Sequence, residues 1–229
     1  MPGLPNEICA SPVMGGGLLF VSGWTQWAGT TRLPSFQSLL DQADANHDGK
    51  ISRDEAPPGP ARMHFPYADA NKDGQVTREE WESLAAIFAK SENALLAIRP
   101  GGQGDVSTPQ LAWKQTRGLP YVPTPLFYRE RLYLVKNGGL ASCFNATNGV
   151  ALFQEERLGA VGDYYSSPVA AHGKICVASQ SGVVTVLAAT DSLTILAQNK
   201  MGEPVMATPA IVGQRLYLRT KSQLYAFGE

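Results

Sequence analysis

A repeated pattern with a period of about 40 residues constrains the fold of this chain most strongly. Each copy reads as a serine or threonine, a proline, a short apolar run, a turn and a second apolar run. The copies are Ser11–Val21, Thr124–Leu134, Ser167–Val177 and Thr208–Leu218. The last three copies follow one another at a nearly constant spacing.

The step from the first copy, at Ser11, to the second, at Thr124, is much longer than the others. An insert of about 60 residues accounts for the excess and leaves one slightly long repeat. A period of about 40 residues with several short strands per repeat is typical of a β-propeller blade. We therefore predict a mainly β chain, a partial or four-bladed propeller, with the insert in its first blade.

The strands can be placed coarsely from the apolar runs and the turns between them. In the first blade they are Ile8–Met14 and Leu18–Gly23 before the insert, and Ala94–Ile98 and Gln110–Lys114 after it; in the second Tyr121–Tyr128, Arg131–Val135, Gly139–Phe144 and Val150–Gln154; in the third Ser167–Ala171, Lys174–Ala178, Val183–Ala188 and Thr194–Asn199; in the fourth Met206–Val212, Arg215–Arg219 and Gln223–Phe227. The predicted domains are residues 1–32 (half of blade one), 33–92 (the insert) and 93–229 (the rest of blade one and blades two to four).

The insert contains two copies of a twelve-residue pattern, which begin at Asp44 and Asp69. Each copy has oxygen-bearing side chains at positions 1, 3, 5 and 9, glycine at 6, an aliphatic residue at 8 and glutamate at 12. That spacing is typical of a calcium-binding EF-hand loop, so we predict a small α-helical EF-hand pair that holds two Ca²⁺ ions. The candidate ligands are Asp44, Asn46, Asp48, Lys50, Ser52 and Glu55 in the first loop, and Asp69, Asn71, Asp73, Gln75, Thr77 and Glu80 in the second.

The chemistry of Ca²⁺ explains this spacing. The ion takes six to eight oxygen ligands, and short side chains at positions 1, 3 and 5 converge on one side of it. Lys50 and Gln75 at position 7 contribute only a backbone carbonyl, and the glutamates close the far side with both carboxylate oxygens. Ile51 and Val76 are expected to pair in a short two-stranded bridge between the loops.

Prolines interrupt the linker between the loops, at positions 57, 58, 60 and 66. Proline is excluded from helix interiors, so the two inner helices are predicted to be very short. The outer helices have apolar stripes that we interpret as core, Phe36, Leu39 and Leu40 in the first and Trp81, Leu84, Ala85 and Phe88 in the last, and Thr77 and Glu80 form a capping box. Short inner helices favour a structural ion site over a calcium-driven switch.

Composition excludes several other classes of function. The net charge is −1 and 17% of the residues are charged, so nothing predicts a nucleic-acid partner. Cys9, Cys143 and Cys176 lie far apart among apolar residues and are expected to be buried free thiols. The sequence shows no signal peptide, and no apolar run approaches the length of about 18 residues that a membrane span needs.

The run Ser142–Phe153 resembles the docking element Ala-x-Asp-x-x-Thr-Gly-Lys-x-x-Trp of pyrroloquinoline-quinone-type (PQQ-like) propellers. Val183–Ala188, Leu216–Leu218 and Leu224–Phe227 fit the same repeat, and the resemblance covers nearly all of the chain except the insert. Phe153 stands where the family has its docking tryptophan, so Trp113 is the remaining candidate for that role.

The resemblance implies one of two functions. Some members are quinoprotein dehydrogenases, which oxidise alcohols or sugars with the quinone and a Ca²⁺ ion in the propeller channel. Others lack the cofactor and act as scaffolds, such as a lipoprotein of the outer-membrane barrel assembly machinery. The calcium site, general base and quinone-binding arginine of the catalytic members have no recognisable counterpart in this sequence, so PQQ is not expected.

We therefore predict a calcium-binding, non-catalytic scaffold or protein-interaction module located outside the cytoplasm. The compartment follows indirectly, because a proline-interrupted EF-hand pair would bind weakly and extracellular calcium is abundant enough to load it. The alternatives are a quinone-dependent dehydrogenase, or a fragment of one, and a carbohydrate-binding module that uses Trp24 and Trp27. The expected partners are calcium and another protein or further propeller blades.

The number of blades leaves three explanations open. The chain is part of a longer propeller, or it closes as a four-bladed ring in which Pro2–Ile8 supplies the last strand, or two copies combine into an eight-bladed homodimer. We favour the first and third explanations, because an open array of sheets exposes strand edges that invite pairing with another chain.

Overall fold

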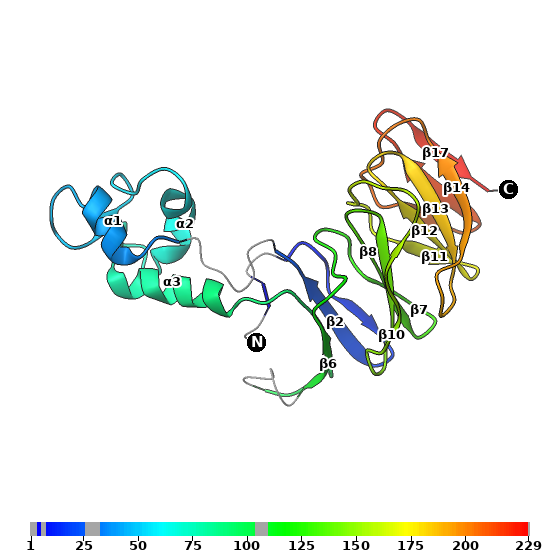
Figure 1. Ribbon diagram of the computed structural model, residues 1–229, viewed down its shortest axis with the longest axis horizontal. Helices are drawn as coiled ribbons and strands as arrows, with labels where there is room; N and C mark the ends of the chain where they lie inside the picture. Colours follow the sequence, from blue (N-terminus) through cyan, green and yellow to red (C-terminus); the bar gives the residue numbers. More distant parts are fainter. Residues whose placement is uncertain (1–3, 6–7, 26–32, 104–109, 229) are drawn as a thin grey trace. The chain divides into compact units, whose positions relative to one another are not determined.

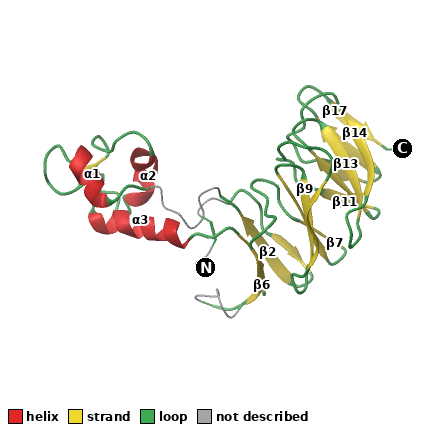
Figure 2. Ribbon diagram, in the orientation of Figure 1, coloured by secondary structure: helices red, strands yellow, loops and turns green. Residues whose placement is uncertain are grey.

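The computed structural model describes residues 4–5, 8–25, 33–103 and 110–228 of the chain. The chain divides into two compact units, of which one is Gln26–Glu92 and the other combines Gly3–Thr25 with Asn93–Glu229. The first unit carries all the helices of the described residues, and the second is built from β-strands (Figures 1 and 2).

The described part of the β-unit contains four antiparallel sheets, each formed from strands that follow one another along the chain. The first sheet consists of β1 (Val13–Gly15), β2 (Leu18–Gly23), β5 (Ala94–Ile98) and β6 (Leu111–Gln115); the second of β7 (Leu126–Tyr128), β8 (Arg131–Lys136), β9 (Leu140–Asn145) and β10 (Ala151–Arg157); the third of β11 (Val169–Ala171), β12 (Lys174–Ala178), β13 (Val183–Ala188) and β14 (Ile195–Lys200); the fourth of β15 (Ala210–Val212), β16 (Arg215–Arg219) and β17 (Leu224–Phe227).

The sheets pack face to face. Strand β8 is apolar on both of its faces because each face enters a different core. Successive side chains of a strand point to opposite faces of the sheet. Leu132 and Leu134 enter a core shared with the first sheet, whereas Tyr133 and Val135 enter a core shared with the third sheet. A strand between two cores therefore reads as a continuous apolar run.

Antiparallel sheets in this sequential order, of which three have four strands and the last has three, are the blades of a propeller, so the predicted fold class is confirmed. The insert leaves the first sheet after β2 and returns at β5, which pair with each other directly from Leu19–Ile98 to Gly23–Ala94. Thr25 and Asn93 close the base of the insert through two hydrogen bonds of 2.6 and 2.9 Å. The insert thus lies at a turn, where an addition disturbs no ladder of the sheet.

The repeated serine or threonine links one sheet to the next. The Ser11 N–H donates to Thr124 Oγ1 at 3.1 Å, the Thr124 N–H donates to Ser167 Oγ at 3.0 Å, and the Ser167 N–H donates to Thr208 Oγ1 at 2.9 Å. The first strands of consecutive sheets also contact each other, β1 with β7, β7 with β11 and β11 with β15. The hydroxyl of each repeat is therefore an inter-sheet contact, for which alanine would be no substitute.

Trp113 of β6 docks the first sheet on the second. Its indole Nε1–H donates to the Ala146 carbonyl at 2.9 Å, and its ring lies 5.7 Å from the Phe20 ring. The ring also lies over Gly149, whose φ is +73° and where an added Cβ would come within 2.6 Å of the indole. Gly149 is thus required twice, for its backbone conformation and for the close approach of the tryptophan.

The segment before β1 bears on two expectations, the closing strand and the burial of the cysteines. Part of Pro2–Ile8, the predicted closing strand, lies outside the described residues, and its described members belong to no strand. The cysteine prediction is wrong for Cys9, which is exposed because the segment before β1 lies at the surface, whereas Cys143 and Cys176 are buried. Burial raises the pKa of the Cys143 thiol to about 12 and that of Cys176 to about 11.

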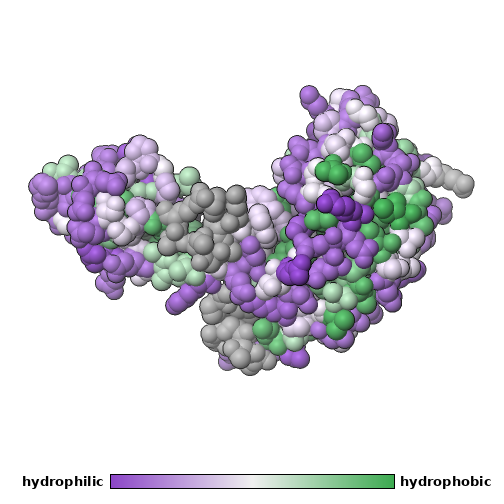
Figure 3. All heavy atoms as spheres, in the orientation of Figure 1, coloured by the Kyte–Doolittle hydropathy of each residue, from purple (hydrophilic) through white to green (hydrophobic). Residues whose placement is uncertain are grey.

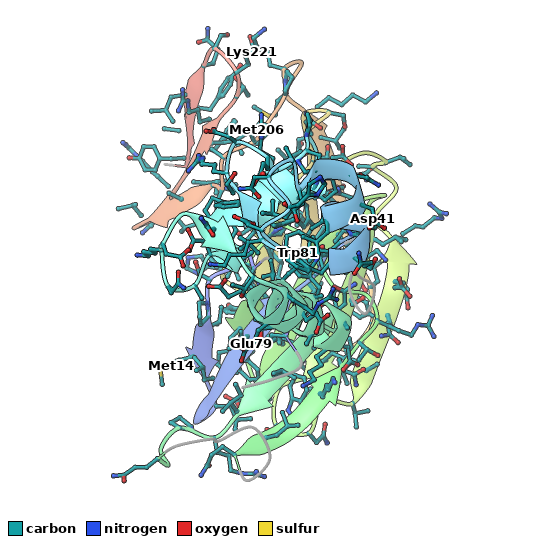
Figure 4. The ribbon with its side chains drawn as sticks, turned by 90° about the vertical axis from the view of Figure 1, so that its left-hand side faces the viewer. Met14, Asp41, Glu79, Trp81, Met206 and Lys221 are labelled. Carbon is teal, nitrogen blue, oxygen red and sulfur yellow. The ribbon has the colours of Figure 1, made fainter. Side chains whose placement is uncertain are left out.

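The helical unit consists of α1 (Phe36–Ala43), α2 (Pro60–Ala68) and α3 (Arg78–Lys90), with the two-residue strands β3 (Ile51–Ser52) and β4 (Gln75–Val76). Phe36, Leu39, Phe65, Trp81 and Leu84 form its core, with Leu40 and Phe88 packed against it. Figure 4 shows Trp81 among these helices, where only 2% of it is exposed. No helix of the described residues is long and apolar enough to cross a membrane.

The prediction for the inner helices is partly wrong. Residues 53–59 form turns rather than a helix, but α2 is nine residues long and contains Pro66. Pro60 lies at the start of α2, where the missing N–H has no partner to lose, and Pro66 lies near its end. Helix α2 therefore tolerates one proline at its start and another near its end.

Candidate metal centre

Helix ends and the short β-bridge position the two twelve-residue loops. Asp44 follows α1 and Asp69 follows α2, and their N–H groups donate to Leu40 O at 3.1 Å and Phe65 O at 2.9 Å. Near the end of each loop, Ile51 and Val76 pair across the bridge, as predicted, and both side chains are almost fully buried. The loops therefore begin at defined helix ends and are joined to each other at position 8.

Inside the first loop the oxygens at positions 1, 3 and 5 accept hydrogen bonds from the backbone. Asp44 accepts from the Asp48 and Gly49 N–H groups at 3.2 and 3.0 Å. Asn46 Oδ1 also accepts from Asp48 N–H at 3.0 Å, and Asp48 Oδ1 accepts from Lys50 N–H at 2.9 Å. The backbone thus folds around three oxygen-bearing side chains, which are held on one side of the loop.

The second loop repeats this arrangement contact for contact. The four equivalent distances, from Asp69 to the N–H groups of positions 5 and 6, from Asn71 to position 5 and from Asp73 to position 7, are 3.1, 3.0, 2.9 and 2.9 Å. Each nearly equals its counterpart in the first loop. Two sequences that differ at positions 4, 7, 8, 9 and 11 therefore adopt one loop geometry.

The glutamates at position 12 reach back across their loops. Glu55 Oε2 accepts from Ser52 N–H at 2.9 Å and Ser52 Oγ at 2.7 Å, and its Oε1 accepts from Ala45 N–H at 3.2 Å. Glu80 Oε2 accepts from Thr77 N–H and Oγ1 at 2.9 and 2.8 Å, which completes the predicted capping box of α3. The backbone bond from Ser52, with its hydroxyl, lowers the pKa of Glu55, and the backbone bond from Thr77 lowers that of Glu80.

Both loops need a residue at position 6 that accepts a positive φ. Gly49 has φ +77° and Gly74 has φ +84°, a region that side chains disfavour. His47 and Lys72 at position 4 share the left-handed conformation, at +56° and +59°. The turn between positions 3 and 7 is thus the strained part of each loop.

The donor set fits a hard divalent cation. Each loop offers three carboxylates, one amide, one hydroxyl and the carbonyl of position 7, all oxygen donors. Among the described residues no group of three His, Cys, Asp or Glu side chains is close enough to hold a metal by itself. An ion in either loop would therefore draw on amide, hydroxyl and carbonyl oxygens as well, and on a glutamate that gives up its hydrogen bonds.

A cavity that the sequence did not predict lies between the third and fourth sheets. Its volume is about 980 Å³, and Val169, Cys176, Val184, Leu216 and Phe227 contribute to its largely apolar wall. His172, Lys174, Lys200 and Arg215 are its titratable residues apart from Cys176 and Tyr225. Its formation depends on how two separate repeats pack, which no local pattern reveals.

The tryptophans of the carbohydrate alternative do not form a described pair. Trp24 is half-buried and lies edge-on to Tyr121, with ring centroids 5.7 Å apart. Trp27 lies outside the described residues.

Comparison with known proteins finds a family match within the helical unit. The sequence model of the EF-hand family matches residues 36–55 and 65–85, which include both twelve-residue loops completely. A search of curated proteins found no match.

Solved structures with similar β-sheets include the crystal structure of BamB from Moraxella catarrhalis, with a TM-score of 0.45 and 16% identity over 59% of this chain and 40% of that chain. The computationally designed protein Ika8 has a TM-score of 0.44 and 14% identity over 61% and 44% of the two chains. A europium-containing methanol dehydrogenase has a TM-score of 0.36 and 12% identity over 46% and 21%. The chain spans less than half the length of each, and these similarities assign it no activity.

Proposed function

We propose that this chain is a calcium-binding, non-catalytic scaffold or protein-interaction module, in which each EF-hand loop holds one Ca²⁺ ion. The ligands in the first ion site are Asp44, Asn46, Asp48, Ser52, Glu55 and the Lys50 carbonyl, and those in the second are Asp69, Asn71, Asp73, Thr77, Glu80 and the Gln75 carbonyl. The observation that carries the proposal is the near-identical hydrogen bonding of the two loops around these oxygens.

The ion sites serve a structural role rather than a switch. The loops are joined by the buried pair Ile51–Val76, and the residues on either side of them enter one core with Trp81. Opening that core would expose its apolar side chains to water. Calcium that binds only the folded unit instead stabilises it by mass action.

The β-unit supplies the interaction part of the proposed function. Large apolar side chains are exposed on its first and fourth sheets, and such surfaces mark interaction sites on soluble proteins. The partner is another protein or further propeller blades, including those of a second copy of this chain. An extracytoplasmic location fits the expected weak calcium sites, since extracellular modules bind calcium with Kd values of about 0.1 to 1 mM.

A calorimetric Ca²⁺ titration of chelator-stripped protein tests the calcium sites. The unaltered chain is expected to bind two ions, and the double variant Glu55→Gln/Glu80→Gln to bind none in the same range. Asp54→Asn/Glu79→Gln is the matched control, because it removes the same charges at position 11 of each loop. Absence of binding to the unaltered chain, or equal loss in the control, would contradict the proposed sites.

The rival function is a quinone-dependent dehydrogenase. Incubation with PQQ and Ca²⁺, followed by removal of free quinone, distinguishes the two. The scaffold proposal predicts no retained quinone absorbance and no dye reduction with alcohols or sugars. A retained chromophore together with substrate-dependent dye reduction would favour the enzyme.

A further inference from the structure

The third sheet shows how one sheet of the array receives the next. On one of its faces, Cys176, Ala178 and Val184 form a buried cluster with Val205 and Leu218, which come from the fourth repeat. Val169 and Val186 share that face, because they pair across the sheet with Cys176. Apolar residues on this face of the third sheet are therefore covered by the fourth sheet.

The fourth sheet repeats the same face at equivalent positions of its register. Tyr217 pairs with Ala210 and Ala226, just as Cys176 pairs with Val169 and Val186. Leu224 pairs with Arg219, just as Val184 pairs with Ala178. We call this surface the fourth-sheet face, and its apolar members are Ala210, Val212, Tyr217, Leu224 and Ala226.

The fourth-sheet face is open where its counterpart is buried. Leu224 is 71% exposed and Val212 is 63% exposed, whereas Val184 of the third sheet is 5% exposed. Figure 3 shows hydrophobic side chains at the surface over the region of β11–β17. Arg215, which pairs with Val212, and Arg219, which pairs with Leu224, depart from the apolar pattern, and their long stems can carry the guanidinium groups out to water.

The first sheet presents the complementary surface at the other end of the array. Met14, Leu19 and Ile98 are in register across β1, β2 and β5, as Ile211, Leu216 and Phe227 are in the fourth sheet. Val21 pairs with Leu96 as Leu218 pairs with Tyr225. We call Met14, Leu19, Val21, Leu96 and Ile98 the first-sheet face; Met14 is exposed, Leu19, Val21 and Ile98 are half-buried, and Leu96 is buried.

In the fourth sheet, the residues equivalent to the first-sheet face point toward the third sheet. Leu216 and Leu218 belong to the cluster between those sheets, and Ile211, Tyr225 and Phe227 line the cavity there. In the first sheet, Met14 is 69% exposed, and Figure 4 shows it pointing away from its strand. The chain thus carries both halves of one sheet-to-sheet interface, one half at each end.

The series of hydroxyl contacts between repeats also stops at the first and fourth sheets. Ser11, Thr124 and Ser167 each donate an N–H to the hydroxyl of the following repeat. Among the described residues no further hydroxyl accepts from the Thr208 N–H, and no N–H donates to the Ser11 hydroxyl. One more step of the series would join Thr208 to a Ser11 that follows it in space.

We propose that the fourth-sheet face binds the first-sheet face of a second copy of this chain, and that two such contacts close a dimer of two-fold symmetry. The proposal rests on the interaction role proposed above and names its partner. Each contact continues the interface already formed between the third and fourth sheets. A head-to-tail contact that closes after two copies leaves neither face exposed.

Sedimentation velocity of the calcium-loaded chain tests the proposal. We expect a species of twice the 24.6 kDa chain mass at concentrations of about 10 µM and above, because stable contacts of this type commonly have micromolar or lower Kd values. Leu224→Arg alters one face and Met14→Arg the other, and each is expected to raise the dimer dissociation constant at least tenfold. Met63→Arg is the matched control, because Met63 is equally exposed, at 67%, but lies in α2.

A mixing experiment distinguishes a contact between the fourth-sheet face and the first-sheet face from a contact between two identical faces. Each single variant keeps one intact face, so an equimolar mixture of Leu224→Arg and Met14→Arg chains is expected to form a weak heterodimer. Four results would overturn the proposal: a monomer throughout the concentration range, a dimer that both variants leave intact, a dimer sensitive to only one of them, or open polymers in place of a dimer.

The test does not depend on the calcium sites. Circular dichroism and the calcium titration of each variant show whether the chain remains folded and whether the loops still bind. A monomer that binds two ions would overturn only the dimer, and a dimer that binds no calcium would overturn only the ion sites.

Discussion

At the scale of single residues, Glu55 and Glu80 combine two roles in one carboxylate. Each accepts hydrogen bonds from a serine or threonine three residues earlier, and each is the expected bidentate ligand at position 12. Glutamine keeps the acceptor needed for capping but removes the charge. The two roles can therefore be separated by one substitution.

We expect Glu55→Gln or Glu80→Gln to weaken calcium binding at its own loop by at least tenfold, which is about 1.4 kcal/mol. The melting temperature of the calcium-free protein should stay close to that of the unaltered chain. Calorimetry on each variant, with Asp54→Asn and Glu79→Gln as the respective controls, measures both quantities. Unchanged affinity in either glutamine variant would remove that glutamate from the ligand set.

Glu203 is a carboxylate whose hydrogen bonds are expected to stabilise the β-unit at neutral pH. It accepts from Ser222 Oγ, Thr220 Oγ1 and Ser222 N–H at 2.5, 2.6 and 3.0 Å. These bonds, led by the Ser222 hydroxyl, lower its pKa from 4.5 to about 2. A lowered pKa in the folded state means stability that is present above pH 4.5 and lost as the pH falls toward 2.

Glu203→Gln should therefore lower the melting temperature at pH 7, and the difference from the unaltered chain should shrink between pH 4.5 and 2. Thermal melts across this range provide the measurement. Glu156→Gln, at an exposed position of β10, controls for a general loss of charge. A difference that stays constant down to pH 2 would show that the carboxylate is not the source of the effect.

At the scale of elements, Ser167 connects the second and third sheets. Its hydroxyl accepts from the Thr124 N–H at 3.0 Å. Ser167→Ala is expected to destabilise the β-unit by about 1 kcal/mol, the usual net value of one intramolecular hydrogen bond. Ser167→Thr should cost less, because threonine occupies this place in the second and fourth repeats.

Denaturant unfolding of the two variants provides that comparison. An alanine variant as stable as the threonine variant would mean that the repeated hydroxyl has no part in joining the sheets.

Strands were the elements best predicted from sequence, because alternation of apolar residues and turns is a local signal. The errors occur where a contact between residues far apart in the sequence determines whether a segment joins a strand or a helix. The first strand of each of the four described sheets starts after its Ser/Thr-Pro pair, whereas the predicted strands included that pair. Proline has no N–H for the ladder, and the hydroxyl is used between sheets. In the helical unit, α2 forms despite Pro66, because Ala61, Phe65 and Ala68 are buried in the core.

The candidate site in the helical unit was more predictable than the surfaces of the β-unit. The ligand types and their spacing define the loops locally, and the Ile51–Val76 bridge follows from two copies of one pattern. The cavity between the third and fourth sheets and the exposed faces depend on which repeats stack, so only the assembled sheets reveal them.

At the scale of the whole molecule, we expect the insert and the β-unit to unfold independently of each other. The first sheet is continuous without the insert, since β2 pairs directly with β5 and Thr25 bonds Asn93 at its base. We expect calcium to raise the melting temperature of the helical unit and to leave that of the β-unit almost unchanged. Calorimetric melts with and without a chelator should resolve this, and equal shifts of both transitions would show that calcium clamps the propeller as well.

The central claim is that the two loops hold one Ca²⁺ ion each. Native mass spectrometry of the calcium-loaded chain tests it most directly, because it counts the ions on each protein molecule. The account predicts two ions per chain for the unaltered protein, one for each single glutamine variant and none for Glu55→Gln/Glu80→Gln. An unaltered chain that carries no calcium, or a double variant that still carries two ions, would contradict it.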